Sequence, residues 1–211
     1  VNTPTGNAVI QVDEHGQNSI VVYGGANHEI DREQIERTLS DFSPGDWLLL
    51  QNEISALPYI LEKAHARGME IWLNPSPMDE NVLKCKLSLV SVFVLNEVEG
   101  EQLTGTKIPT AILDKLLQKY PHAAAVLTLG SKGAWYAKED KRAFAPAELV
   151  RAVDTTAAGD TFTGYFMRGM LDGLSPKKSL ILAAKAAAIA VSRPGAAPSI
   201  PLYAEVTSER N

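Results

Sequence analysis

The sequence contains a single cysteine, Cys85, among its 211 residues. One thiol can form neither an internal disulfide framework nor a thiolate cluster for zinc. This usage suits a cytoplasmic setting. The four histidines stand far apart, at positions 15, 28, 65 and 122, so we expect no metal role for them.

Long hydrophobic runs and an excess of positive charge are also missing. No apolar segment is long enough to span a bilayer and no signal peptide is visible, so we expect no membrane partner. The formal net charge of −5 argues against a general nucleic-acid surface. Hydrophobic residues make up 45% of the chain and charged residues 21%, which excludes disorder and predicts one medium globular domain.

Short apolar segments alternate with helical patterns along most of the chain. Buried strands are predicted over 47–50, 70–73, 90–95 and 124–129, and 134–137 pairs with the last of these or follows it. Helices are predicted over 31–39, 54–67, 97–103, 109–120 and 159–171, and from Ser175-Pro176 through 183–191. This alternation predicts an α/β fold, a doubly wound and mostly parallel sheet flanked by helices.

The N-terminal segment has a different pattern. Residues 7–13 and 18–23 alternate apolar and polar side chains, which predicts a β-hairpin with Gly16 at its turn. Gly24-Gly25-Ala26-Asn27 ends the hairpin and is interpreted as a return loop.

Polar or glycine residues follow four of the predicted strands. They are Gln51-Asn52-Glu53, Asn74-Pro75, Asn96-Glu97 and Gly130-Ser131. Because parallel sheets bind ligands at the carboxyl ends of their strands, we expect these segments to line one edge. The turn at 154–164 is expected to join them.

That turn, from Asp154 to Gly164, is expected to follow an apolar strand and to enter a helix. The small residues Ala157, Ala158 and Gly159 allow close approach of a ligand, and N–H groups at a helix start favour an anion. Asp160 would repel a phosphate, but it fits a base that activates a hydroxyl while the backbone holds the phosphoryl group. Taken alone, the segment also fits an ordinary helix start with Asp in its first turn.

The run from Asp154 to Phe162 resembles the C-terminal signature of the ribokinase-like (PfkB) carbohydrate kinases. The resemblance extends along the whole chain and is closest to the ribokinases within that family. It is carried, in order, by residues 5–10, 16–20, 25–27, 73–77, 96–105, 128–133 and 192–196.

The resemblance implies ATP-dependent phosphorylation of a sugar hydroxymethyl group, with a pentose as the expected substrate. Asp160 would be the general base, and the backbone of Ala157, Ala158, Gly159 and Asp160 would form the anion hole. Glu53 would join Asp160 in contacting the sugar. The nucleotide would be held by Asn96, Thr128, Gly130, Ser131, Gly133 and Gly159.

Two cations are implied by the same resemblance. Asn96 and Glu99 would organise Mg²⁺ and the phosphates through water. A monovalent activator, K⁺, would lie between two loops, at Asp154, Thr156, Ala190, Arg193, Gly195 and Ser199. The residues alone leave alternatives open. Asn96 and Glu99 also fit an ordinary helix cap, and Gly130 and Gly133 also fit an ordinary loop. Glu53 also fits a solvated loop residue.

The chain departs from the family in three respects. Ala157 stands where many members carry glycine, and Asn7 and Gln11 are unusual for the first strand, which leaves the sugar open. Roughly the first third of the expected domain, with its sugar clamp, is missing. We therefore expect residues 1–28 to form part of a β lid and its return, and 29–211 to form the nucleotide-binding kinase core. We also expect this chain alone to be poorly soluble or inactive, and we expect a homodimer through the lid.

Other functions remain open at this point. A fructose derivative, deoxyribose or a nucleoside is an alternative substrate, and a non-catalytic nucleotide-binding fragment or paralogue is an alternative function. A dehydrogenase is disfavoured, because no G-x-G-x-x-G follows the first strand.

Overall fold

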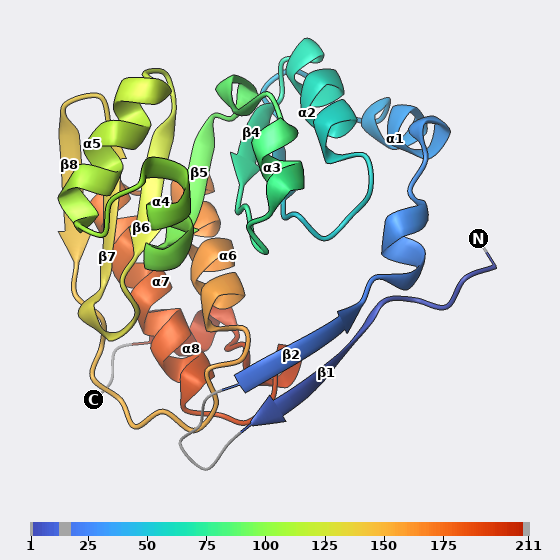
Figure 1. Cartoon of the computed structure of the whole chain (residues 1–211). Helices are drawn as coiled ribbons and strands as arrows, with labels where there is room; N and C mark the ends of the chain where they lie inside the picture. Colours follow the sequence, from blue (N-terminus) through green and yellow to red (C-terminus); the bar gives the residue numbers. More distant parts are fainter. Residues whose placement is uncertain (1, 13–17, 209–211) are drawn as a thin grey trace. The chain divides into compact units, whose positions relative to one another are not determined.

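The computed structural model describes residues 2–12 and 18–208, in two compact units of residues 1–125 and 126–211. The strands, drawn as arrows in Figure 1, are β1 (Asn7–Val12), β2 (Asn18–Tyr23), β3 (Trp47–Leu50), β4 (Glu70–Leu73), β5 (Val92–Asn96), β6 (Ala124–Thr128), β7 (Ala134–Lys138) and β8 (Lys141–Ala145). The α-helices are α1 (Arg32–Leu39), α2 (Leu57–Ala66), α3 (Glu80–Lys84), α4 (Glu97–Thr104), α5 (Pro109–Lys119), α6 (Ala158–Leu171), α7 (Pro176–Val191) and α8 (Tyr203–Thr207). Short 3-10 turns are η1 (Gly25–Glu29), η2 (Leu87–Leu89), η3 (Gly130–Lys132) and η4 (Ala197–Ser199).

The central sheet has six strands in the order β3-β4-β5-β6-β7-β8. The pairs β3–β4 and β4–β5 are parallel, and β7–β8 is antiparallel. Parallel neighbours need a crossover between them, and α2 and α3 lie in the two crossovers of the first unit. The predicted α/β fold, with helices flanking a central sheet and a small hairpin, is confirmed.

Apolar side chains of β4 and β5 form the centre of the first unit. Ile71, Leu73 and Phe93 are fully buried, as is typical of parallel strands covered on both faces. The ring of Trp72 stacks on that of Trp47 in β3, with 4.8 Å between the ring centroids. This pair anchors the terminal strand β3 to the sheet.

β3 is less covered than the sequence indicates. Leu50 is buried, whereas Leu49 is 41% exposed, so the prediction of a buried strand over 47–50 is wrong for this position. β3 comes first in the sheet order, and a terminal strand has a neighbouring strand on one side only to cover its side chains.

The helix predicted over 54–67 begins later, at Leu57. Ala56 has a φ of 60°, a left-handed conformation that is uncommon for residues other than glycine. The Ser55 hydroxyl donates to the carbonyl of Ile30 at 2.8 Å, which holds the preceding residues in a turn. Gly68, with a φ of 74°, follows the helix end as predicted.

Two further details of the first unit differ from the sequence-based expectation. The strand predicted over 90–95 occupies 92–96. The short helix α3 was not predicted. Its N-cap residue is Asp79, whose carboxylate accepts from the N–H groups of Asn81 and Val82. A one-turn helix carries too little periodicity to stand out in a sequence.

The predicted N-terminal hairpin is present as β1 and β2. The strands pair antiparallel, with Asn7 opposite Tyr23 and Val9 opposite Val21. Its turn, predicted at Gly16, lies outside the described residues. The carbonyl of Pro4 accepts from the N–H of Ala26 at 2.9 Å, which ties the hairpin to η1.

Helices α6 and α7 pack closely in the second unit. A side-chain carbon added at Gly169 would lie 2.8 Å from the Ser179 hydroxyl oxygen, so glycine permits the approach. The buried residues Leu182 and Ala186 of α7 form a cluster with Val206 of α8. Within the described part of the chain, no helix is both long and apolar enough to cross a membrane.

The second unit also contains one unpredicted strand and lacks one that was predicted. β8 was missed, and it pairs antiparallel with β7. The apolar strand expected before Asp154 is wrong, because residues 146–157 form no strand. The N–H groups of Val153 and Asp154 donate instead to the carbonyl of Val191 at the end of α7. Apolar side chains of this segment line a pocket rather than joining the sheet.

Candidate functional site

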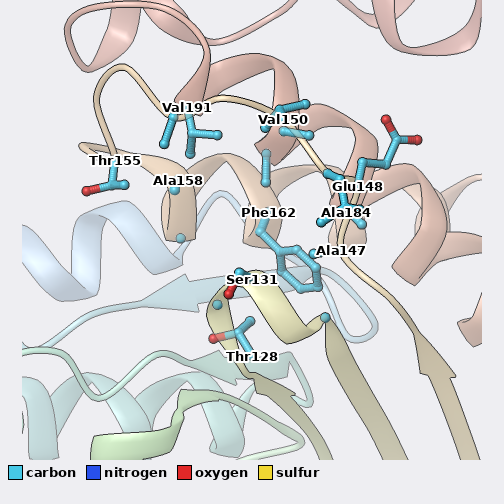
Figure 2. A pocket seen from close by; sticks show the side chains of 17 residues that line it. Thr128, Ser131, Ala147, Glu148, Val150, Thr155, Ala158, Phe162, Ala184 and Val191 are labelled. Atoms are coloured by element: carbon cyan, nitrogen blue, oxygen red, sulfur yellow. The ribbon is translucent and has the colours of Figure 1, made fainter.

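A pocket of about 360 Å³ lies entirely within the second unit. Figure 2 shows it from close by. Four segments line it: the loop after β6, the connection after β8, the start of α6 and the last turns of α7. Its lining residues are Thr128, Gly130, Ser131, Gly133, Ala147, Glu148, Leu149, Val150, Ala152, Thr155, Ala158, Gly159, Phe162, Ala184, Ala187, Ala188 and Val191.

The loop after β6 contributes all four of the nucleotide-site residues predicted there. Gly130 has a φ of 54°, and a side chain added to it would meet open space. Gly133 has a φ of 117°, and a side chain there would lie 2.2 Å from the carbonyl oxygen of Ala145. Glycine is therefore required at Gly133 by the turn into β7. In Figure 2 the hydroxyl-bearing side chains of Thr128 and Ser131 lie at this end of the pocket.

The start of α6 forms the second wall. Ala157 is the N-cap residue, in the left-handed region at a φ of 59°, and it provides no side-chain cap. The first helical hydrogen bond runs from the Thr161 N–H to the Ala157 carbonyl at 2.9 Å. The Ala158 N–H reaches the Thr155 carbonyl at 3.3 Å. Gly159 lines the pocket, and a side chain added there would meet open space, so a ligand can come close to its backbone.

Asp160 follows directly, in the first turn of α6. Its side chain is exposed. The predicted base therefore lies next to the predicted anion hole in one helical turn, at the positive end of the helix dipole.

Small side chains of α7 form the third wall. Ala184, Ala187 and Ala188 leave an apolar surface of small side chains, which has room for a flat ring. The segment after β8 was not anticipated as part of the site. It includes Leu149, which is 96% exposed and yet lines the pocket. The apolar residues that follow Pro146 are the sequence signal for this pocket-lining segment.

Asp154 joins the two loops predicted to hold a monovalent cation. One carboxylate oxygen accepts from the N–H of Thr156 and the other from the N–H of Gly195, both at 2.9 Å. Hydrogen bonds from Thr156 and Gly195 lower the pKa of Asp154, so its charge is retained. The loops are thus adjacent as predicted, 41 residues apart in the sequence.

The remaining members of that predicted cation set lie at the end of α7 and just beyond it. The carbonyl of Ala190 accepts from the N–H of Arg193 at 3.0 Å. The Arg193 guanidinium forms an ion pair with Glu205 at 2.5 Å. Ser199 is fully buried, and its hydroxyl donates to the carbonyl of Ala196.

The first unit carries a separate polar network at the ends of β3, β4 and β5. Gln51 donates to the side-chain oxygen of Asn74 at 2.9 Å, and Asn74 donates to the carbonyl of Val94 at 2.9 Å and to Glu99 at 3.4 Å. Three of the four strand ends predicted to share an edge are therefore connected here. Glu53 lies nearby in sequence, in an exposed turn.

Asn96 and Glu99 form a capping box at the start of α4. The Asn96 side chain accepts from the Glu99 N–H, and a Glu99 carboxylate oxygen accepts from the Asn96 N–H, both at 2.9 Å. Glu99 is only 5% exposed. Burial raises the pKa of Glu99, while hydrogen bonds from Asn96, Ser76 and Asn74 oppose that rise. Asn96 and Glu99 therefore form the helix cap that the sequence also allowed, and the Glu99 carboxylate accepts hydrogen bonds mainly from amide groups.

No group of three or more histidine, cysteine, aspartate or glutamate side chains that could hold a metal ion occurs among residues 2–12 and 18–208.

Comparison with known proteins identifies the fold and the chemistry. The model of the pfkB family of carbohydrate kinases matches residues 1–202. The chain belongs to this family. As a pfkB family member it is a sugar kinase, a transferase of phosphoryl groups.

Ribokinases from several organisms are similar to this chain in sequence and in structure. Ribokinase of Schizosaccharomyces pombe is 37% identical over 220 residues, which cover 100% of this chain and 69% of that protein. The crystal structure of Thermotoga maritima ribokinase is 35% identical, with a TM-score of 0.80, covering 98% of this chain and 69% of that one. Arabidopsis thaliana ribokinase, solved in complex with ribose and ATP, is 30% identical, with a TM-score of 0.79 and 97% and 69% coverage.

Proposed function

We propose that this pfkB family kinase transfers the terminal phosphoryl group of ATP to the hydroxymethyl group of ribose. The observation that carries the proposal is the pocket between the glycine loop after β6, the uncapped start of α6 and the alanine face of α7. The ribose and ATP bound by the Arabidopsis relative support the choice of both substrates.

In the proposed reaction the sugar hydroxyl oxygen bonds to the terminal phosphorus of ATP while the bond from that phosphorus to the bridging oxygen breaks. The hydroxyl proton passes to the carboxylate of Asp160, and ADP and the sugar phosphate leave. N–H groups at the start of α6, from Ala157 to Asp160, stabilise the negative charge on the transferring group. Gly159 admits that group because it has no side chain.

Mg²⁺ would be held near Asn96 and Glu99 through water. The residues fit this outer role better than direct binding, because both oxygens of the Glu99 carboxylate accept hydrogen bonds from Asn96. When bound, the ion neutralises phosphate charge. Within this proposal Glu53 contacts the sugar from its exposed turn.

K⁺ would lie between the two loops that Asp154 joins. Because both carboxylate oxygens of Asp154 already accept backbone N–H groups, Asp154 supplies charge and fixes the loops. Carbonyl oxygens and the Ser199 hydroxyl would supply the remaining ligands. The proposed role of the ion is to hold the loop before α6 in the conformation that forms the anion hole.

Other substrates of the same class stay as alternatives. Deoxyribokinase of Salmonella typhi is 30% identical over 210 residues, covering 94% of this chain and 67% of that protein. Asn7 and Gln11 of β1 are exposed. Because polar side chains at these positions are unusual for the family, a panel of several sugars should be tested as substrates. A fructose derivative, deoxyribose and nucleosides belong in that panel beside ribose. The predicted cytoplasmic location and the division of the chain at residue 28 stay predictions.

The test of the proposed function is the variant Asp160→Asn, made in a protein that also supplies the N-terminal part of the domain expected to precede residue 1, and assayed for ADP release with ribose and ATP. The amide keeps the shape of the side chain but cannot accept the proton, so we expect turnover to fall about 10²–10⁴-fold. Nucleotide binding, measured by calorimetry, should be retained. The same assay in K⁺ or Na⁺, and with Mg²⁺ removed by a chelator, measures the two cations.

Near-wild-type turnover by Asp160→Asn would remove Asp160 as the base. If the wild-type chain bound no nucleotide, the pocket would not be an ATP site, and the proposed function would be wrong. Binding without turnover on any sugar of the panel would favour the non-catalytic alternative.

A further inference from the structure

Glu148 is the one charged side chain that lines the pocket. It lies in the connection after β8, is half-buried, and sits among small apolar neighbours, Ala147 before it in the chain and Ala184 on α7. Among the described residues, nothing forms a hydrogen bond or ion pair with its carboxylate, in contrast to Asp154 and Glu99. A carboxylate at the rim of a pocket can accept a hydrogen bond from a ligand that enters the pocket.

The position of Glu148 in the pocket indicates which part of a nucleotide it meets. Figure 2 shows Thr155 and Ala158 at one side of the Phe162 ring, and Glu148, Ala147 and Ala184 at the other. The uncapped start of α6, where phosphates bind, is on the side of Ala158. A nucleotide whose phosphates reach that helix start therefore places its base toward Glu148, with the ribose between.

Apart from Glu148, the side chains expected to contact the base cannot distinguish one base from another. Ala147, Ala184, Ala187 and Ala188 offer no side-chain donor or acceptor. They can stack against any ring, but they cannot tell one base from another. The carboxylate at the rim can, because an ionised carboxylate only accepts hydrogen bonds. It suits an amino group on the edge of the base and disfavours a carbonyl oxygen there.

We propose that Glu148 determines the base preference of this kinase by accepting a hydrogen bond from the exocyclic amino group of adenine. The inference rests on the proposed nucleotide site. The carboxylate extends outward from the rim in Figure 2, and no protein partner among the described residues fixes it there. Rotation about its side-chain torsions brings it to the edge of a base that stacks on the alanines of α7.

The test compares equilibrium binding of ADP and IDP, which differ at C6 and N1 of the purine ring. ADP has an amino group on C6 and no hydrogen on N1, whereas IDP has a carbonyl oxygen on C6 and a hydrogen on N1. The wild-type chain, Glu148→Ala and Glu148→Gln are titrated with both by calorimetry. The control is Glu62→Gln, an exposed glutamate of α2 that makes the same charge change outside the pocket.

For the wild-type chain and Glu62→Gln we expect ADP to bind about tenfold more tightly than IDP, since a hydrogen bond to a charged group has roughly that effect. In Glu148→Ala the ratio should fall to near one. In Glu148→Gln it should fall at least as far, because the amide can rotate to donate to the carbonyl oxygen of IDP.

Equal ADP-to-IDP ratios in all four proteins would overturn the role of Glu148 and leave the nucleotide site standing. Absence of binding of either nucleotide to the wild-type chain would overturn both. A ratio that changes as much in Glu62→Gln as in Glu148→Gln would show a general charge effect and would also overturn the proposal.

Discussion

Two residues predicted to act at cation sites, one in each unit, accept hydrogen bonds from the backbone. Asp154 accepts two N–H groups from separate loops, and Glu99 closes a capping box. The sequence identified both residues by their type and position. It could not show that their oxygens are already shared with the backbone, because Gly195 comes to Asp154 only when α6 and α7 pack together.

Gly159 provides a prediction at this scale. The change Gly159→Ala places a methyl group in open space at the pocket wall. Because alanine favours the helix, the free energy of unfolding should rise by up to about 1 kcal/mol. The methyl group should keep a phosphoryl group away from the helix start and lower kcat on the order of 10²-fold.

The control for that change is Gly164→Ala, at a later position of α6. A side chain there also meets open space, and Gly164 does not line the pocket. Thermal unfolding should show both variants to be as stable as the wild type or more so. Equal turnover in the two variants would contradict the anion hole at Gly159.

Among the elements, α6 differs between its two ends. Its start is left open toward the pocket, and its last turns are pressed against α7. The sequence placed both helices within a residue of their observed bounds, because Ser175-Pro176 and the small residues before Asp160 are strong local signals. The prediction of an apolar strand before Asp154 was wrong, because the apolar residues of 146–157 line a pocket instead of joining the sheet. Local periodicity does not distinguish these two uses.

Gly169 provides the prediction for this scale. A side chain there would lie 2.8 Å from the hydroxyl of Ser179, a fully buried residue. Gly169→Ala should therefore lower the free energy of unfolding by about 1–3 kcal/mol through overpacking, in spite of the better helix propensity of alanine. Chemical denaturation followed by circular dichroism measures this change. Stabilisation similar to that of Gly164→Ala would show that the two helices separate easily.

At the scale of the whole molecule, the hairpin of β1 and β2 carries several exposed apolar side chains among its described residues. Val9 and Val21 face each other across the strands and are 58% and 66% exposed, and Val22 and Tyr23 are exposed as well. Exposed apolar side chains gathered on one hairpin favour an interaction site there. We propose that the lid pairs with the lid of a second copy, as the family resemblance implies.

The variant Val21→Lys tests this pairing. Burying a valine contributes about 1.5–3 kcal/mol, so the charge should weaken the homodimer by about tenfold or more in Kd. Sedimentation velocity over a concentration series measures the change. Leu83→Lys, at an exposed apolar residue of α3, should have no effect. A monomeric wild-type chain at all concentrations would exclude the homodimer.

The sequence by itself determined the class of fold, the family and the turn from Asp154 to Gly164, because these depend on local patterns and on motifs in fixed order. Only the tertiary structure decided what each group at that turn can do. It left the start of α6 without a side-chain cap and made Gly159 part of the pocket wall. It also used both oxygens of Asp154 to join two loops and placed Glu148 at the opposite end of the pocket. These outcomes depend on contacts between segments tens of residues apart, which no local pattern encodes.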